Sequence, residues 1–435
     1  MGLGIGIPTS VYKIGEIPEF RQILDNKEVE EDPNTLKLCK TNIVTRNNEK
    51  YRLVKYDKPY LTVDQIQTLG LLRSVIINSA NRVVSFAPPK SLPWDTFVNM
   101  NPKKTSTIVA EEFIEGTMIN VFWDAKAGLA GAWELATRNT VGAEVSFYKT
   151  NDANQNKTFR EMFLEAAIEN HFDLNMLDPN YCYSFVLQHP NNRIVVPFKT
   201  PQLFLVDIFA ICHTEGGVVN VNIVSLEHVK KDPIWAQTTV RFPQIYTEWQ
   251  SYDELKQRFA CMNTPYHIVG VMVRDKRAGT RTKLRNPTYE NVRNLRGNQP
   301  KLQYQYLSLR KQGAVRDYLE YYPENKKEFH NYREHLHSFT NTLFNNYISC
   351  YVKKEKPLLQ YPQNYRTHMF NLHKIYLDEL RSKKLYITNT VVIKYVNDMP
   401  VTLQMYSLNY NMRKRREDEK LADTREEETT AENIV

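Results

Sequence analysis

The sequence predicts an α+β protein in which antiparallel sheets with flanking helices are followed by an all-helical C-terminal region. Up to about residue 293, short runs rich in β-branched and aromatic residues alternate with turn residues, which is typical of strands. After Pro300, apolar residues recur at steps of three and four, which indicates amphipathic helices. A chain of 435 residues is long enough for two or three domains.

The first region contains seven predicted strands and three predicted helices. The strands are expected at residues 82–86, 118–123, 183–188, 194–198, 203–211, 218–223 and 269–274. Between the strands at 118–123 and 183–188, residues 154–170 have apolar side chains at helical spacing. These are Phe159, Met162, Phe163, Ala166 and Ala167. Shorter helices are expected at 226–230 and 252–260.

The C-terminal region contains three predicted helices. In residues 329–351 the apolar positions are Leu336, Phe339, Leu343, Tyr347 and Tyr351, and residues 368–380 repeat that spacing. A third helix is expected after Thr388, whose hydroxyl can cap its start, and it ends near Pro400. We therefore predict domains at 1–300 and 301–412. Residues 413–435 are charge-dense and poor in apolar residues, so we expect a disordered tail.

Composition narrows the environment and the partners. The formal net charge of +8 and the isoelectric point near 8.9 favour an anionic partner such as nucleic acid. The five cysteines form no C-x-x-C pair, which indicates free thiols in a reducing compartment. Neither an apolar run of eighteen residues nor a signal-peptide pattern is present, so we expect an intracellular, cytoplasmic protein without a membrane partner.

One stretch, residues 109–122, has the frame of a known nucleophile motif. Apolar residues lead into the corner Glu115-Gly116 and out again into a β-type run. Covalent nucleotidyltransferases present Lys-x-Asp-Gly between two strands in this way, and Phe113 stands at the lysine's position. A phenylalanine has no amine to attack an α-phosphate, so this position cannot form the phosphoamide of that chemistry.

Further landmarks follow in order along the chain. Arg73 is followed by Ser74 where a glycine is usual, Lys90 ends a Pro-x-x-Lys-like segment, and residues 134–142 contain Arg138. Residues 183–195 contain Val186 and end in Pro-Asn-Asn-Arg-Ile-Val, and residues 267–274 contain Val269. Residues 280–289 carry Lys283 and Arg285 in a Lys-x-Lys-like arrangement. Together with the Phe113 stretch, this order resembles the RNA ligases of the bacteriophage T4 RNA ligase 1 type.

The resemblance implies a nucleotidyltransferase fold, with ATP and Mg²⁺ as the family's cofactors. It implies that no catalytic set is intact, because Phe113 replaces the nucleophile and Val186 and Val269 replace two metal-organising glutamates. Mg²⁺ with too few oxygen ligands would have little reason to bind, so we expect no metal site. The nucleotide- and phosphate-binding residues that it implies are Arg73, Lys90, Glu115, Gly116, Arg138, Lys283 and Arg285.

Three interpretations of function remain open. The first is a degenerate RNA-ligase-like pseudoenzyme that binds RNA, in preference to DNA, or nucleotide without catalysis. The second is a structural or assembly component that uses the fold to bind proteins; its source would be a large DNA virus, with a location in the virus factory or virion. The third is an active ATP-dependent RNA ligase in which Lys90 or Lys55 replaces the nucleophile. Singly, each retained cation also fits a solvated surface residue, and each apolar replacement fits a strand core.

Overall fold

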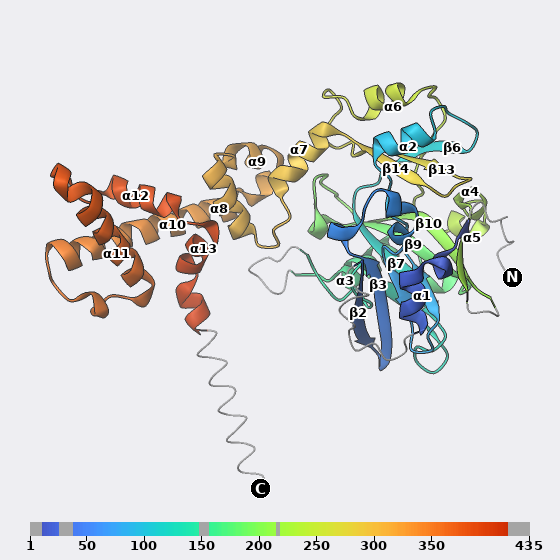
Figure 1. Ribbon diagram of the computed structural model, residues 1–435, viewed down its shortest axis with the longest axis horizontal. Helices are drawn as coiled ribbons and strands as arrows, with labels where there is room; N and C mark the ends of the chain where they lie inside the picture. Colours follow the sequence, from blue (N-terminus) through green and yellow to red (C-terminus); the bar gives the residue numbers. More distant parts are fainter. Residues whose placement is uncertain (1–10, 26–37, 148–155, 215–217, 416–435) are drawn as a thin grey trace, which may run out of the picture. The chain divides into compact units, whose positions relative to one another are not determined.

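The computed structural model describes residues 11–25, 38–147, 156–214 and 218–415 of the chain. It divides into two compact units, Met1–Asn294 and Leu295–Val435, the first containing the sheets and the second only helices (Figure 1). The boundary predicted at residue 300 lies a few residues beyond this division. Of the predicted tail, residues 413–415 are helical, and the remainder lies outside the described residues.

The first unit is built on three sheets in which all the strand pairs are antiparallel. The central sheet has the order β1-β11-β10-β9-β7-β8, the N-terminal sheet β2-β3-β4-β5, and the β13 sheet β12-β6-β13-β14. The strands of the central sheet are β1 (Val11–Tyr12), β7 (Thr117–Asp124), β8 (Ala132–Ala136), β9 (Tyr181–Gln188), β10 (Gln202–His213) and β11 (Val219–Ile223). Those of the N-terminal sheet are β2 (Cys39–Arg46), β3 (Glu49–Tyr56), β4 (Val75–Ile77) and β5 (Val83–Phe86). Those of the β13 sheet are β6 (Ile108–Glu112), β12 (Ile245–Tyr246), β13 (Gly270–Asp275) and β14 (Arg281–Arg285).

Helices flank these sheets. They are α1 (Pro18–Asp25), α2 (Trp94–Met100), α3 (Phe159–Glu169), α4 (Leu226–Val229), α5 (Pro233–Ala236), α6 (Tyr252–Phe259) and α7 (Pro287–Arg296). The α+β class is therefore confirmed. Strand–turn patterning predicted it because antiparallel neighbours can be joined by short local connections.

The central sheet packs differently on its two faces. One face is covered by α3, α4 and α5, with Phe163, Phe185 and Trp235 in the shared core. On the other face, Phe122 and Phe209 pack against the N-terminal sheet. Toward the opposite ends of the same strands, this second face meets the β13 sheet. The candidate site lies where the packing partner of the central sheet changes from the N-terminal sheet to the β13 sheet.

One predicted strand is wrong. Residues 194–198 form bends rather than a strand. Two of their backbone N–H groups, those of Val195 and Val196, donate to the carboxylate of Glu115. This satisfies them without a neighbouring strand, so an apolar run of strand-like composition remains a loop. The other six predicted strands correspond to β5, β7, β9, β10, β11 and β13. Among the described residues, eight strands lie outside the predicted ranges: β1, β2, β3, β4, β6, β8, β12 and β14.

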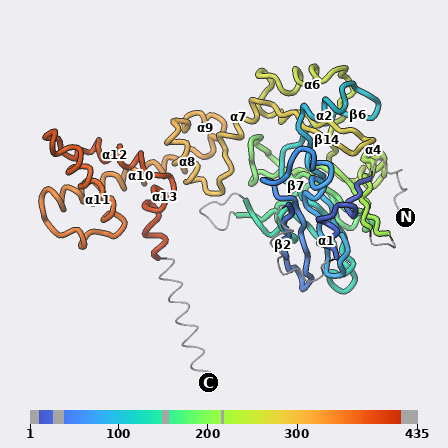
Figure 2. Tube along the Cα trace, viewed as in Figure 1, coloured from blue at the N-terminus to red at the C-terminus, as the bar shows by residue number. Residues whose placement is uncertain are grey.

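In the second unit, all the secondary-structure elements that the structure describes are helices (Figure 2). They are α8 (Leu302–Gln312), α9 (Val315–Tyr321), α10 (Lys326–Tyr347), α11 (Gln363–Ile375), α12 (Asn389–Asp398) and α13 (Val401–Leu408). Five-residue π-helical segments extend α10 through Val352 and α11 through Leu380, which gives these helices the lengths that the apolar spacing predicts. The Thr388 hydroxyl accepts the Val391 N–H at 3.4 Å and caps α12, as predicted.

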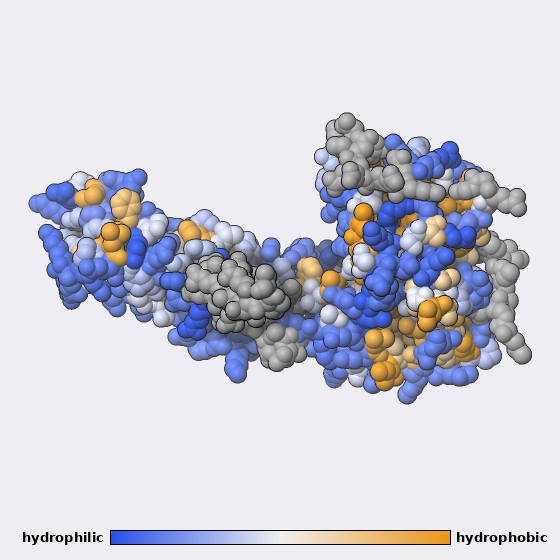
Figure 3. Space-filling view, turned by 90° about the horizontal axis from the view of Figure 1, so that it is seen from below, coloured by the Kyte–Doolittle hydropathy of each residue, from blue (hydrophilic) through white to orange (hydrophobic). Residues whose placement is uncertain are grey.

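The helical unit has its own buried side chains, including Leu343, Leu372 and Val392 from α10, α11 and α12. On the face seen in Figure 3, most surface residues of both units are hydrophilic, and hydrophobic residues form small separate areas. Within the described ranges, no helix combines the length and the apolar character that crossing a bilayer requires.

Candidate functional site

Phe113 lies where the chain crosses from the β13 sheet to the central sheet, between β6 and β7. The Arg285 guanidinium carbon is 5.7 Å from the centroid of its ring. The register explains this contact: Arg285 pairs with Gly270, and Glu112 pairs with Val271, so Phe113 and Arg285 flank Gly270, which has no side chain to separate them. At Phe113, the chain therefore has a cation–π contact.

Glu115 and Gly116 form the turn itself. The Glu115 carboxylate accepts backbone N–H groups from Val195 at 2.8 Å and Val196 at 3.1 Å. Burial raises the pKa of this carboxyl, although the two backbone donors act in the opposite direction. Gly116 has a φ of 150°, and a Cβ there would lie 2.4 Å from the Leu187 carbonyl oxygen. In this structure both residues hold the turn against β9 and the loop that follows it.

The retained cations Arg73, Lys90, Lys283 and Arg285 come together, and Arg281 joins them. Arg281, Lys283 and Arg285 alternate along β14, so they share one face of the β13 sheet. Burial, followed in order of size by the charges of Arg285, Arg73, Lys90 and Arg281, lowers the pKa of Lys283 to about 7. We call these five residues the cation cluster.

Lys283 differs from the other members in its partners. Among the described residues, its Nζ has no hydrogen bond or ion pair, whereas Lys90 Nζ donates to the Ser91 carbonyl at 2.8 Å. Arg73 Nη1 donates to the Pro88 carbonyl at 3.4 Å. Arg285 Nη1 pairs with Glu290 at 2.5 Å. Carbonyl partners do not neutralise charge, so the cluster keeps a positive excess centred on a half-buried lysine, a favourable environment for an anion.

Buried ion pairs lie beside the cluster. Asp207 on β10 accepts from Arg274 at 2.5 Å and pairs with Arg281 at 3.6 Å, and Glu111 also pairs with Arg274. A register irregularity between Leu205 and Asp207 interrupts the strand alternation there, a device that re-aims side chains next to functional sites. Burial raises the pKa of Glu111 even though Arg274 opposes the shift.

Sequence reasoning missed these ion-paired residues. The signal was present, because charged side chains at Glu111, Asp207 and Arg274 interrupt runs that are otherwise apolar. Such interruptions are unusual in strands that both pack in a core and pair on two sides. They join the β13 sheet to the central sheet and thereby fix the position of β14.

Arg138 lies apart from the residues that act most strongly on Lys283. It is exposed, follows β8, and its guanidinium carbon lies 5.1 Å from the centroid of the Tyr56 ring. Its charge lowers the pKa of Lys55 after burial, and it also acts on Arg73. Of the predicted set, Arg138 is therefore at the margin of the cation cluster, and Glu115 and Gly116 support the turn.

Val186 and Val269 both lie in apolar surroundings. Val186 on β9 pairs with Met118 on β7 and with Phe204 on β10, so three apolar residues lie side by side across these strands. Val269 is 7% exposed, and its carbonyl accepts the Asn286 N–H. Within the part of the chain that the structure describes, no three His, Cys, Asp or Glu residues are grouped to hold a metal. These residues do not fit a Mg²⁺ site, and we derive no step through one.

Two cavities adjoin the ion pairs. One, of about 510 Å³, is lined in part by Tyr12, Lys90 and Arg281 and has the size of a small-molecule site. The other, of about 90 Å³, includes Asp207 and Arg274. Of the described residues that line them, none is Lys283, so the larger cavity reaches the cation cluster only at Lys90 and Arg281.

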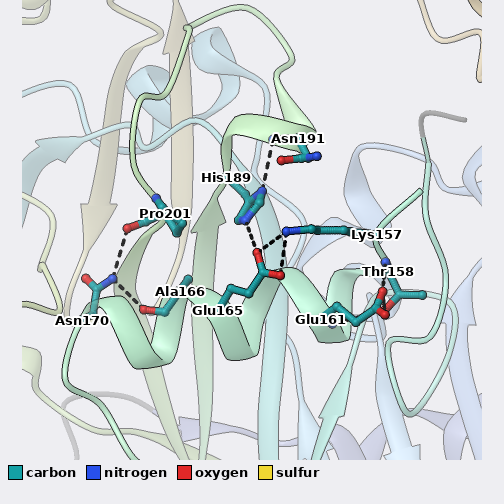
Figure 4. Close-up of polar contacts among 9 residues, drawn as sticks. All are labelled: Lys157, Thr158, Glu161, Glu165, Ala166, Asn170, His189, Asn191 and Pro201. Atoms are coloured by element: carbon teal, nitrogen blue, oxygen red, sulfur yellow. Dashed lines mark hydrogen bonds and ion pairs between the residues drawn. The ribbon is translucent and has the colours of Figure 1, made fainter. Parts of the chain in front are cut away.

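A polar network anchors the loop that supports Glu115 (Figure 4). His189 Nδ1 accepts the Asn191 N–H at 3.1 Å, so Nε2 carries the proton and donates to Glu165 on α3 at 3.0 Å. Lys157 Nζ lies 2.7 Å from the same carboxylate. Burial lowers the pKa of His189, although Glu165 opposes the shift, and the neutral ring matches this hydrogen-bond pattern.

No protein-family model matches this chain. Over 200 residues it is 24% identical to an RNA ligase of Rhodothermus phage RM378, a stretch that covers 41% of this chain and 44% of the phage protein. The chain thus matches less than half the length of that relative. The resemblance to RNA ligases that the motifs predict is confirmed by this match.

Solved structures give weaker matches. An archaeal ATP-dependent RNA ligase aligns with 86% of this chain and 75% of its own, at 10% identity and a TM-score of 0.30. A Naegleria gruberi RNA ligase aligns with 58% of this chain and 76% of its own, at 11% identity and a TM-score of 0.31. Scores this low carry no argument about the site, which therefore depends on the chain's own residues.

Proposed function

We propose that this chain is an RNA-ligase-like protein that binds RNA or nucleotide phosphate at the cation cluster without the covalent step of RNA ligases. One observation carries the proposal: a single site contains both the cation cluster around Lys283 and Phe113, which stands at the nucleophile position that the resemblance implies. Phosphate oxygens would supply the acceptor that Lys283 Nζ lacks among the described residues. The apolar side chains of Met118, Val186 and Phe204 give a metal no oxygen ligand.

The ligand that fits best is a phosphate ester of a nucleotide or an RNA strand. The phage relative is an RNA ligase, so RNA is the polymer we propose. Lys283 and Arg285 would contact phosphate oxygens directly, while Arg281 is held by Asp207 and fixes the strand. If ATP binds, the same side chains would hold its phosphates.

Binding is tested with single-stranded RNA and ATP against ionic strength. We expect wild-type affinity for RNA to fall steeply with salt, because phosphate contacts release counterions. The double variant Lys283→Gln, Arg285→Gln should bind RNA about tenfold more weakly at low salt. Lys256→Gln, an exposed position on α6, is the matched control and should change nothing. If wild-type protein binds neither ligand, the proposal is wrong, and the scaffold interpretation is favoured.

A second candidate function has one observation in its favour. With a pKa of about 7, a substantial fraction of Lys283 is a neutral amine near neutral pH, the form that a nucleophile requires. Its Nζ lone pair would attack the α-phosphorus of a nucleoside triphosphate, form a P–N bond and release pyrophosphate, and the amine proton would pass to solvent. Burial also lowers the pKa of Lys55 and of Lys90, the two sequence-based candidates.

Labelling separates the two candidates. The protein is incubated with ATP or GTP labelled at the α-phosphate, with Mg²⁺ or Mn²⁺, and then denatured. We expect no retained label. A label that is lost in Lys283→Arg, but kept in Lys90→Arg and Lys55→Arg, would contradict non-catalytic binding and support Lys283 as the nucleophile.

A further inference from the structure

Two lysines lie directly opposite each other on neighbouring strands of the N-terminal sheet. Lys40 on β2 and Lys55 on β3 are direct partners in the antiparallel register. Like charges at directly opposed positions destabilise such a pair. Asp57 offsets part of the repulsion, since its Oδ2 lies 2.9 Å from Lys40 Nζ. A local arrangement that disfavours folding and is only partly compensated inside the protein is often a functional site.

Arg138, in the turn that follows β8, is the third cation of this group. Lys55 Nζ donates to Asn139 Oδ1 at 2.8 Å, which ties β3 to the turn that carries Arg138. Burial lowers the pKa of Lys55, and the charges of Arg138 and Lys40 lower it further, with Asp57 opposing them. Three cations thus share one described carboxylate, and Lys40 and Arg138 are exposed to solvent.

This group is electrostatically continuous with the cation cluster. After burial, Arg138 lowers the pKa of Arg73, and Arg73 in turn acts on Lys90 and Lys283. Lys58, just beyond Asp57, also acts on Lys90. Positive potential therefore extends from the half-buried Lys283 outward to the exposed edge of β2 and β3.

We propose that Lys40, Lys55 and Arg138 form a second phosphate subsite that holds a neighbouring phosphodiester of a single-stranded RNA whose first phosphate occupies the cation cluster. The inference rests on the proposed function and adds the path of the strand. Single-stranded RNA is favoured because Tyr60, two residues after Lys58, is 52% exposed and offers a ring on which an unpaired base can stack. Lys55, considered from sequence as a substitute nucleophile, is here a phosphate ligand.

The subsite is tested in the full chain with Lys55→Gln, Arg138→Gln. Its matched control is Lys50→Gln, an exposed lysine at the other end of β3. Binding of a labelled single-stranded RNA of about 12 nucleotides is measured by anisotropy across about 50 to 250 mM salt. Binding of ATP is measured in parallel, and thermal unfolding checks that each variant is folded. Lys40→Gln, at an exposed position, provides a second variant if the double variant is unstable.

We expect the double variant to bind RNA about tenfold more weakly at low salt and to lower the salt slope by about 1.4, since each single-strand phosphate contact contributes about 0.7. ATP affinity should change less than about twofold, because the proposal places the phosphates of a mononucleotide at the cation cluster alone. Unchanged RNA binding, or equal losses for RNA and ATP, would overturn the second subsite while leaving the proposed function intact. If wild-type protein binds ATP but no RNA, the strand path is wrong. If it binds neither, both proposals fail.

Discussion

At the scale of single residues, Phe113 has a clear electrostatic role beside the cation cluster. The ring of Phe113 lies against the Arg285 guanidinium at 5.7 Å. A lysine at the same place would meet a cluster that already lacks counter-charge. The phenylalanine therefore stabilises the retained cations where a nucleophile would repel them.

This makes a prediction about Phe113→Lys. We expect the variant to lower the free energy of unfolding by about 1–2 kcal/mol, because it removes a cation–π contact and adds a like charge. Chemical denaturation measures the change. Phe113→Tyr, which keeps the ring, is the control and should remain close to wild type. A Phe113→Lys variant as stable as wild type would show that the contact with Arg285 has no energetic weight.

Lys283 should make stability depend on pH. Its pKa is about 7 in the folded chain against 10.5 for the unperturbed group, so between these values the unfolded chain binds more protons. Its destabilising effect is therefore full below pH 7 and fades as pH rises toward 10.5. We expect Lys283→Met to raise the Tm by about 2 °C at about pH 6 and by less at about pH 9.

The control for this effect is Lys283→Arg. The arginine keeps its charge across that pH range, so its Tm should fall below that of wild type at the higher pH. Thermal unfolding in matched ionic strength gives both comparisons. An equal gain for Lys283→Met at both pH values would mean that the charge of Lys283 is already screened.

At the scale of elements, the turn between β6 and β7 has a structural role, which its Glu115-Gly116 pair supports. A Cβ at Gly116 would lie 2.4 Å from the Leu187 carbonyl oxygen and 2.7 Å from Val186 Cγ1. The glycine allows this turn to approach β9, while Glu115 binds the loop after it. The frame persists without its nucleophile because it also joins two sheets.

Gly116→Ala should accordingly be costly. We expect a loss of about 3 kcal/mol in the free energy of unfolding, from backbone strain and the clash with β9. Gly128→Ala is a matched control, since Gly128 also has a positive φ, of 66°, but a Cβ there meets nothing within 4 Å. That variant should lose only about 1 kcal/mol. Equal losses in the two variants would mean that the close approach to Leu187 is not limiting.

Sequence predicted most elements near the site because their side chains alternate or recur at a regular period. It failed at residues 194–198, where a buried carboxylate of Glu115, distant along the chain, supplies the hydrogen bonds that a neighbouring strand would have made. It also missed β2 and β3, whose exposed positions carry many polar residues. Such strands depend on pairing with each other more than on an apolar pattern.

At the scale of the whole molecule, each unit has buried residues of its own. Phe163 on α3 and Leu343 on α10 are both 0% exposed, one in each unit. We expect two thermal transitions, with Phe163→Ala lowering one and Leu343→Ala the other, each by about 3 kcal/mol or more. Calorimetry resolves them, and a shift of both transitions by either variant would show that the units unfold together.

The sequence by itself determined the α+β class, the helical C-terminal unit and the resemblance to RNA ligases, because these depend on local periodicity and on motifs read in order. It also named Lys283 and Arg285, because residues 280–289 resemble the Lys-x-Lys motif of that family. Only the tertiary structure decided which cations meet: Arg73 and Lys90 join β14, Arg138 lies with Lys55, and Glu115 turns to a backbone loop. The physical reason is that charge, burial and pKa depend on neighbours brought together by three sheets, and those neighbours are far apart in the chain.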